Sequence, residues 1–261
     1  MKRMKTKEDL HAAILTLSPA QIHILTEMAE AMKDSIGQTL VSDSDILVTA
    51  FVDHFSNRLR MHHATHSEKF KKKAFEFAFH SACIAAGRKS VIVNDPTNPG
   101  ADVIVDGVPF SLKTEAAASI HDEHISISKL MEARWIRECL TREDFARETT
   151  RRVVAHLEKY ARILMLRAFT LSPTEIRYDL MEIPRELLLK ISVLKPADFE
   201  ERTENGSSRA DVYVPEGKGR IRAFSVRLDG SVEKVTISGL LTVLCVRHGS
   251  WKMKTVPPEE S

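Results

Sequence analysis

The dipeptide Asp106-Gly107 constrains the fold of this chain more than any other short feature of its sequence. It lies between two apolar segments within residues 101–115, which read ADVIVDGVPFSLKTE. Asp-Gly in this setting indicates a two-residue β-hairpin loop, because both residues of that turn adopt positive φ. Such a loop also fixes the opposed pairs. These are Val105 with Val108, Ile104 with Pro109, Val103 with Phe110, and Asp102 with Ser111.

The two faces of this hairpin differ in chemistry. Side chains alternate along each strand, and opposed residues point to the same face. The apolar face, which must pack against a core, consists of Val103, Val105, Val108, Phe110 and Leu112. The other face carries Asp102, Ser111, Lys113 and Glu115. The turn therefore predicts that two carboxylates and an ammonium share one patch of sheet, and a loop of odd length would break the prediction.

This polar patch has the groups that metal-assisted phosphodiester hydrolysis requires. Carboxylates hold a hard cation through oxygen, and the cation polarises the phosphate and helps to generate hydroxide. A nearby lysine positions or deprotonates the water and stabilises developing charge. Asp102 and Lys113, on adjacent strands, fit this scheme. The spacing alone favours a simpler alternative, a surface salt bridge on an ordinary hairpin.

Glu76 is a second candidate, because it lies in the aromatic helical segment Phe75-Glu76-Phe77-Ala78-Phe79. A carboxylate there is either half buried or on a narrow polar stripe. Lys72 lies four residues earlier, so an ion pair along the helix explains it without chemistry. The functional alternative is that the helix places Glu76 beside the hairpin as a metal ligand or as an anchor for a ligand water.

Composition narrows the class of protein. Of the 261 residues, 43% are hydrophobic and 28% are charged, which is typical of a soluble globular chain. No apolar run approaches the roughly 18 residues that span a membrane, so no membrane partner is expected. The charged first ten residues resemble no secretory signal, and we expect a cytoplasmic location. Three separated cysteines indicate free thiols rather than disulfides or a zinc site.

Charge gives a weaker indication of the partner. The net charge of +2 is by itself no reason to expect nucleic acid. Basic residues nevertheless cluster in residues 58–73, in Arg147, Arg151 and Arg152, and in residues 218–227. Each cluster is more often a solvated face, but three in one nearly neutral chain slightly favour nucleic acid. The Gly-Lys-Gly segment 217–219 lacks P-loop spacing, so no nucleotide cofactor is expected.

The first 90 residues are predicted to be helical. Ser18-Pro19 is a helix start signal, and Ser44 or Asp45 is a candidate cap for a second helix through residues 46–59. A third helix is expected from about Ser67 to Ala86, where Gly87 ends it.

The rest of the chain mixes strands and helices. After the hairpin we expect a helix from Ser128 and a longer one over residues 144–160. Two strands are predicted over 163–169 and 176–183, followed by a short helix opened by Pro184. From Arg209 the chain is strand-like, with a second Asp-Gly hairpin at residues 229–230. This order predicts an α/β or α+β fold.

Several blocks of the sequence resemble the SmaI-like family of type II restriction endonucleases, which belongs to the PD-(D/E)xK nucleases. The blocks are TNPGADVIVDGVPFSLKTEAA, FEFAF, ISISKLME, YARILMLRAF, YDLMEIP with RELLL, FSVRLDG and VRHGSW. They cover most of residues 58–258 in preserved order, while the first 50 or so residues match weakly. Ordered blocks are more specific than any single motif.

The resemblance assigns roles to individual residues. Asp102 falls on the Asp of the family motif and Lys113 on its Lys, where it orients the attacking water. The Pro that usually precedes the Asp is Ala101, and the acidic residue two positions before the Lys is Ser111. Another carboxylate must replace it. Glu76 is favoured as catalytic residue and metal ligand, Glu115 is the close alternative, and the Leu112 carbonyl is a further expected ligand.

The resemblance also implies a fold and an activity. The implied fold is α/β, a three-layer restriction-endonuclease-like core with a mixed central sheet flanked by helices and an extra C-terminal β region. We expect one domain over residues 1–261, with a helical N-terminal part (1–66), a catalytic core (67–191) and a β-rich C-terminal part (192–261). The implied activity is Mg²⁺-dependent cleavage of double-stranded DNA by a homodimer, with 5′-phosphate products.

The target that the resemblance implies is a palindrome, such as the GC-rich six-base sequence CCCGGG. Three other classes stay open: a repair or junction nuclease on the same fold, a DNA-binding relative with an inactive site, and a hydrolase of another substrate. Ser111 motivates the inactive alternative.

DNA contacts are less well indicated. Lys129, at the start of the helix expected from Ser128, is a candidate because a helix N-terminus can bind phosphate. The other candidates are His62, Arg134, Arg222 and Arg227. Ordinary solvated side chains explain all of these residues equally simply.

Overall fold

A mixed sheet of seven strands is the largest feature of the computed structural model, which describes residues 6–93 and 100–256. The strand order is β1-β11-β7-β6-β4-β3-β2; β4 and β6 are parallel and the other neighbours antiparallel. The strands are β1 (Gly37–Leu40), β2 (Ser90–Ile92), β3 (Val103–Val105), β4 (Val108–Glu115), β6 (Arg162–Ser172), β7 (Glu175–Ile183) and β11 (Val246–Lys254). The prediction of a mixed central sheet is confirmed.

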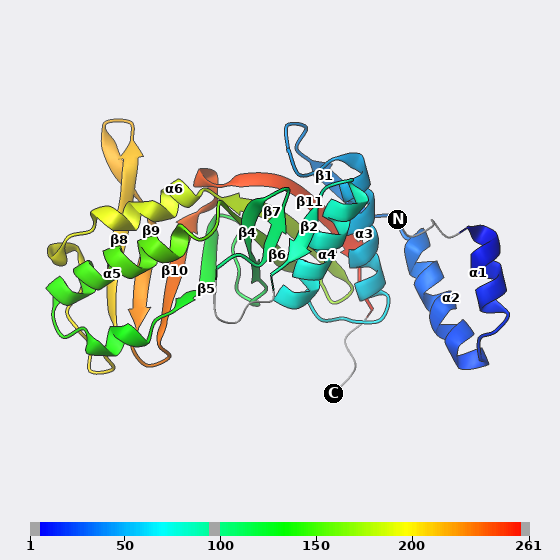
Figure 1. Ribbon diagram of the computed structural model, residues 1–261, viewed down its shortest axis with the longest axis horizontal. Coiled ribbons are helices and arrows are strands. Elements are labelled where there is room, and N and C mark those ends of the chain that lie inside the picture. The colour runs from blue at the N-terminus through cyan, green and yellow to red at the C-terminus, as the bar shows by residue number, and fades with distance from the viewer. Residues whose placement is uncertain (1–5, 94–99, 257–261) are drawn as a thin grey trace.

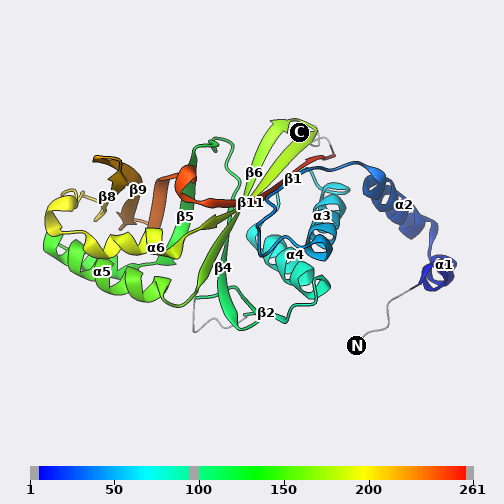
Figure 2. The same ribbon diagram turned by 90° about the horizontal axis from the view of Figure 1, so that it is seen from above.

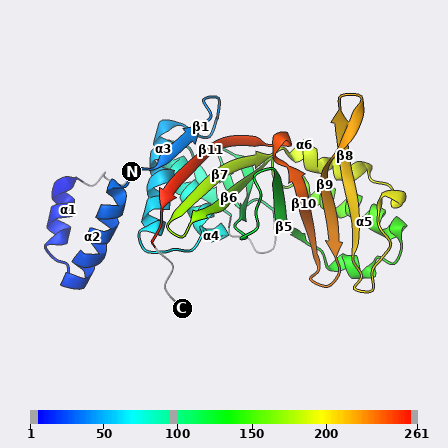
Figure 3. The same ribbon diagram turned by 180° about the vertical axis from the view of Figure 1, so that it is seen from behind.

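A second, antiparallel sheet lies beside the first (Figure 3). Its order is β5-β10-β9-β8. The strands are β5 (His124–Glu132), β8 (Ser208–Glu216), β9 (Gly219–Asp229) and β10 (Lys234–Leu241). β5 follows β4 in the chain, so the segment after the predicted active strand crosses from the large sheet to the small one.

Helices cover one face of the large sheet, and a helix together with the small sheet packs against part of the other face (Figures 1 and 2). The helices are α1 (Lys7–Ile14), α2 (Pro19–Lys33), α3 (Thr49–His63), α4 (Lys72–Ala85), α5 (Arg142–Leu157) and α6 (Arg185–Leu188), with 3-10 turns η1 (Arg134–Glu138), η2 (Leu189–Val193), η3 (Pro196–Asp198) and η4 (Thr242–Leu244). On one face α3 and α4 pack through phenylalanines such as Phe55 and Phe75. On the other face α5 packs through Phe145 and Val153 in a core shared with the small sheet.

The Asp106-Gly107 turn has the predicted conformation. Asp106 has φ of 50° and Gly107 has φ of 84°, and Val105 pairs with Val108 across the two-residue loop. The next pairs, Ile104 with Pro109 and Val103 with Phe110, also have the predicted register. The apolar face packs as expected, because Val103, Val105, Phe110 and Leu112 are all buried.

The helix predicted from Ser128 is wrong, because this segment is strand β5 and only a 3-10 turn, η1, follows it. Ile125 and Ile127 alternate with serines, and both isoleucines are buried. This period of two suits a strand with one buried face. β5 pairs along its length with β10, more than a hundred residues later, and that pairing overrides the helical pattern around Leu130.

Other sequence predictions differ mainly in their bounds. Ser18 caps α2 with Pro19 as its first residue, as predicted, and Gly87 follows the last turn of α4 with φ of 78°. The helix expected after Ser44 begins later, at Thr49, because the Ser44 hydroxyl accepts from backbone amides in the preceding turn. The hairpin at Asp229 is present, but its loop has four residues, since Asp229 pairs with Lys234.

The ends of the described chain contribute differently to the fold. β1 and β11 pair at one edge of the large sheet, so segments near both ends complete it. α1 and α2 instead lie beside the body of the molecule and contain no buried residue (Figure 1). Among the described residues, no helix has the length and apolar character needed to cross a membrane.

Candidate active site

The hairpin brings Asp102 to the beginning of β3, where its side chain reaches across to β4. Oδ2 of Asp102 accepts from the Leu112 amide at 2.6 Å and from the Ser111 hydroxyl at 3.4 Å. The Asp102 amide donates to the Phe110 carbonyl at 2.8 Å, which continues the ladder of the hairpin. The position of Asp102 is therefore fixed by the register that the turn imposes.

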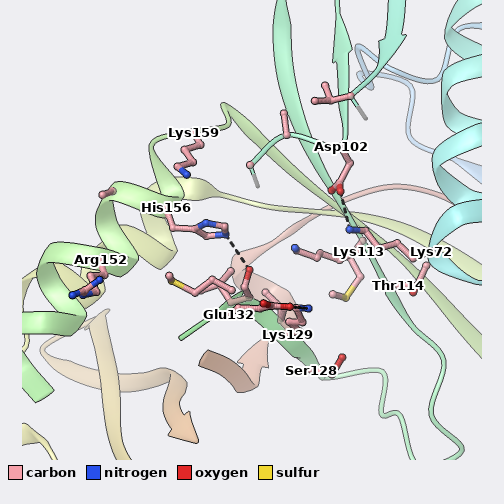
Figure 4. A pocket seen from close by; sticks show the side chains of 18 of the residues that line it. Lys72, Asp102, Lys113, Thr114, Ser128, Lys129, Glu132, Arg152, His156 and Lys159 are labelled. Atoms are coloured by element: carbon pink, nitrogen blue, oxygen red, sulfur yellow. Dashed lines mark hydrogen bonds and ion pairs between the residues drawn. The ribbon is translucent and has the colours of Figure 1, made fainter. Parts of the chain in front are cut away.

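Lys113 follows Leu112 on β4, and its side chain points into the same space as that of Asp102 (Figure 4). The pKa of Lys113 is lowered to about 8, mainly by burial and also by the nearby charge of Lys72, while Asp102 opposes the shift. The ammonium is thus less favoured here than in water. Such a lysine exchanges its proton more readily near neutral pH than an ordinary one.

Glu76 is brought to this site by α4. Its side chain is only 2% exposed, and Oε2 accepts from Lys73 Nζ at 2.7 Å. Oε1 is buried and, within the described part of the chain, has no hydrogen-bond partner. Lys72 Nζ lies 3.5 Å from Oε1. The ion pair along the helix that the sequence suggested is therefore present, but it is long.

Lys72 connects the helix to the sheet. Its Nζ lies 2.7 Å from Asp102 Oδ1 and 3.5 Å from Glu76 Oε1, so one ammonium stands between the two carboxylates. Sequence reasoning considered Lys72 only as a helical partner of Glu76. Its contact with Asp102 joins residues 30 positions apart, and no local pattern indicates it.

These groups fit a hard divalent cation. In the part of the chain that the structure describes, no cluster of three or more His, Cys, Asp or Glu residues has the arrangement of a metal site. Two carboxylates do converge on one cation, and the unpartnered Glu76 Oε1 is an acceptor that a metal would satisfy. Leu112 adds a backbone carbonyl on the side of β4 where its amide contacts Asp102. Oxygen donors of this kind suit Mg²⁺.

Glu115 lies on the same strand as Lys113 but belongs to a different set of contacts. Its side chain is 7% exposed; Oε2 accepts from Arg167 Nε at 2.5 Å, and Oε1 accepts from the Ser126 amide at 2.7 Å. Arg167 is fully buried and also donates to the carbonyls of His121 and His124. The structure therefore brings Glu76, and not Glu115, to Asp102.

Asp102 and Lys113 open into a cleft of about 970 Å³ between the large sheet, β5 and α5 (Figure 4). Its charged lining consists of Lys72, Asp102, Lys113, Lys129, Glu132, Arg151, Arg152 and Lys159. Cations dominate this set, as expected of a surface that binds a phosphate backbone.

Helix α5 supplies the part of this wall that the sequence did not assign to the site. His156 donates from Nε2 to the Leu130 carbonyl at 3.0 Å, which connects α5 to β5. One face of α5 and of the segment just after it carries three basic or titratable side chains at intervals of four and three residues: Arg152, His156 and Lys159. That spacing is a signal that sequence analysis could have used.

The structure separates the predicted DNA contacts. Lys129 lines the cleft, although it does so from the middle of β5 and not from a helix start. Arg134, Arg222 and Arg227 do not line it and pair with Glu233, Asp211 and Asp229. His62 lies on α3, where its Nε2 contacts the Glu68 carbonyl and its ring stacks on His66.

Comparison with known proteins identifies the family of the chain. Residues 10–253 match the SmaI family, described as type II site-specific deoxyribonuclease. The chain is 33% identical to the type II restriction enzyme SmaI of Serratia marcescens over 221 residues, which cover 83% of this chain and 85% of that enzyme. No solved structure matches the chain. The matched region includes Asp102, Lys113 and Glu76 and extends over both sheets. This chain therefore belongs to the SmaI family of type II restriction endonucleases and is a site-specific deoxyribonuclease.

Proposed function

We propose that the protein cleaves both strands of DNA at a short palindrome by Mg²⁺-dependent hydrolysis at the site formed by Asp102, Glu76 and Lys113. The observation that supports this most strongly is the convergence of the Asp102 and Glu76 carboxylates on one cationic position beside Lys113. The charged residues that line the cleft of Asp102 and Lys113 are mainly lysines and arginines.

In this proposal Asp102, Glu76 and the Leu112 carbonyl hold the metal ion. A bound divalent cation would polarise the scissile phosphate and lower the pKa of a coordinated water. Lys113 orients the attacking water, and its partly buried ammonium stabilises the negative charge that develops on the phosphate. In-line attack on phosphorus then leaves a 5′-phosphate and a 3′-hydroxyl.

Ser111 replaces the usual acidic residue of the motif, but the carboxylate of Asp102 remains in the site. Its hydroxyl lies 3.4 Å from Asp102 Oδ2, so it helps to hold the carboxylate that remains. We propose that Glu76 supplies the missing second carboxylate from the helix. On this basis the protein is an active nuclease and not an inactive DNA-binding relative.

The wall of the cleft formed by Lys129, Arg151 and Arg152 would bind the phosphates on either side of the scissile bond. Family resemblance supports a GC-rich target such as CCCGGG, read by arginine or lysine contacts to guanine in the major groove. A palindrome matches a twofold protein, so we propose that a homodimer cuts the two strands.

The test is to incubate the purified protein with Mg²⁺ and phage DNA and to sequence the fragment ends. We expect discrete fragments whose ends share one palindrome and carry 5′-phosphates, and no cutting when Ca²⁺ replaces Mg²⁺. Random degradation, or nicking of branched DNA alone, would contradict the proposal. Binding to duplex DNA in Ca²⁺ without any cleavage in Mg²⁺ would instead indicate an inactive relative.

A further inference from the structure

Lys72 occupies the position at which the two proposed metal-binding carboxylates meet. It is the first residue of α4, and its Nζ lies 2.7 Å from Asp102 Oδ1 and 3.5 Å from Glu76 Oε1. The two acids come from different elements, the hairpin and the helix. A cation at this point offsets their mutual repulsion, which is also what a bound metal ion would do.

A divalent cation and the Lys72 ammonium cannot both use this position without a large electrostatic cost. Lys72, Lys73 and Lys113 already surround Asp102 and Glu76. A divalent cation would add two positive charges to a group of three ammoniums and two carboxylates, which increases the repulsion over a few ångströms. Metal binding is therefore favoured if Lys72 leaves, and favoured more if DNA phosphates arrive.

Lys72 is the partner that is free to move. Its side chain is 45% exposed, whereas Asp102 and Glu76 are 16% and 2% exposed. A lysine is a point charge on a flexible stem, so it can exchange one anionic partner for another at low geometric cost. Lys72 lines the proposed DNA cleft, and a phosphate of bound DNA is the partner that it could take up there.

We propose that Lys72 is a built-in substitute for the metal ion: it holds Asp102 and Glu76 together in the free protein and moves to a DNA phosphate when the metal binds. This rests on the proposed metal site. The exchange makes metal binding weak in the free protein and stronger when DNA is present, so it couples the two ligands.

The test is to titrate the DNA-free protein with Mn²⁺ alone and follow binding by electron paramagnetic resonance and calorimetry. We expect Lys72→Met to bind Mn²⁺ at least about tenfold more tightly than the wild type, because the competing charge is gone. The matched control is Lys73→Met, which removes an equal charge from the same turn. Lys73 contacts Oε2 of Glu76 and its side chain is 74% exposed, so we expect a change below about threefold.

Two further measurements use the same variants. Metal-free Lys72→Met should unfold at a lower temperature than metal-free Lys73→Met, and Mn²⁺ should restore more of that loss in Lys72→Met. In Ca²⁺, the slope of log DNA affinity against log salt should fall by about one for Lys72→Met, because one phosphate contact is lost.

The variant Asp102→Asn, titrated in the same way, distinguishes a failure of the proposed role of Lys72 from a failure of the proposed metal site. If Asp102→Asn loses Mn²⁺ binding but Lys72→Met binds no more tightly than Lys73→Met, the metal site stands and the substitution role of Lys72 is wrong. If Asp102→Asn binds Mn²⁺ as the wild type does, the metal site lies elsewhere and the role of Lys72 falls with it.

Discussion

Two acidic clusters lie a short distance apart along the hairpin and β4, and they differ in the cations that face them. In the lysine-bridged cluster, Asp102 and Glu76 meet the ammonium of Lys72 at the edge of the cleft. In the arginine-bound cluster, Glu115 is held by Arg167, which is fully buried, and by the Ser126 amide. Sequence alternation predicts Asp102 and Glu115 for the same face, so the sequence pattern does not distinguish them.

The chemistry of the partners explains the difference. Arg167 donates to Glu115 and to three backbone carbonyls from one rigid guanidinium, so it cannot leave without losing several hydrogen bonds. Lys72 makes ion pairs from a flexible and partly exposed side chain. A carboxylate becomes available to a metal or a substrate when its counter-ion can move away. We therefore expect the lysine-bridged cluster to be the reactive site and the arginine-bound cluster to be a structural ion pair.

The largest effect is expected from Asp102→Asn in the lysine-bridged cluster. The amide oxygen can still accept from the Leu112 amide, so the hairpin should keep its register. The charge that would hold the metal is lost, and cleavage in Mg²⁺ should fall by at least about a thousandfold. Initial cleavage rates measure this, and thermal unfolding checks the fold. An active Asp102→Asn protein would remove this cluster from the catalytic site.

The matched pair Glu76→Gln and Glu115→Gln compares the two clusters directly. Both changes remove one charge from a buried carboxylate without altering its size. Glu76→Gln should lower the cleavage rate about a hundredfold and change the free energy of unfolding by less than about 1 kcal/mol, because the lysines that face it can be resolvated. Glu115→Gln leaves the buried charge of Arg167 unpaired and should cost about 3–5 kcal/mol of stability.

The control for this pair is cleavage by Glu115→Gln at a temperature where it is fully folded, as judged by circular dichroism. We expect its rate to stay within about threefold of the wild type. A large loss of cleavage with an intact fold would place Glu115 in the catalytic site after all.

The sequence predicted those features that one short segment determines. Asp106-Gly107 sets its own turn, the turn sets the register, and the register places Asp102 beside β4. The same segment correctly predicted which face of the hairpin is buried. These results need only backbone conformation and alternation, which are local properties.

The features that the sequence did not predict depend on distant partners. β5 is a strand because β10 pairs with it, and the pattern around Leu130 alone favours a helix. Glu115 is paired with Arg167, which lies 52 residues away in the sequence. Lys72 contacts Asp102 across 30 residues, and no spacing rule indicates which lysine of the basic segment 58–73 would do so.

The smallest predicted effect is a pH dependence of the hydrogen bonds that hold the two clusters in place. His63 is buried on α3, where Nε2 lies 2.8 Å from the Tyr178 hydroxyl and Nδ1 lies 3.0 Å from the His66 carbonyl. The Tyr178 hydroxyl accepts from the Phe70 amide, just before α4. A neutral His63 that donates through Nδ1 and accepts through Nε2 satisfies this network, which anchors the helix carrying Lys72 and Glu76. By contrast, His121 and His124 give the arginine-bound cluster only backbone carbonyls.

Burial lowers the pKa of His63 to about 4, below the ordinary value of 6.5, so the unfolded chain binds the proton more readily. The stability that the neutral His63 network gives to the folded state is complete above about pH 6.5, and it is lost as the pH falls from there towards 4. Amide exchange, corrected for intrinsic rates, should therefore show protection at Phe70 falling by up to about tenfold per pH unit in this range, with less than about twofold change at Ser126. His63→Gln should remove the pH dependence at Phe70, and equal losses at both amides would show that acid loosens the two clusters together.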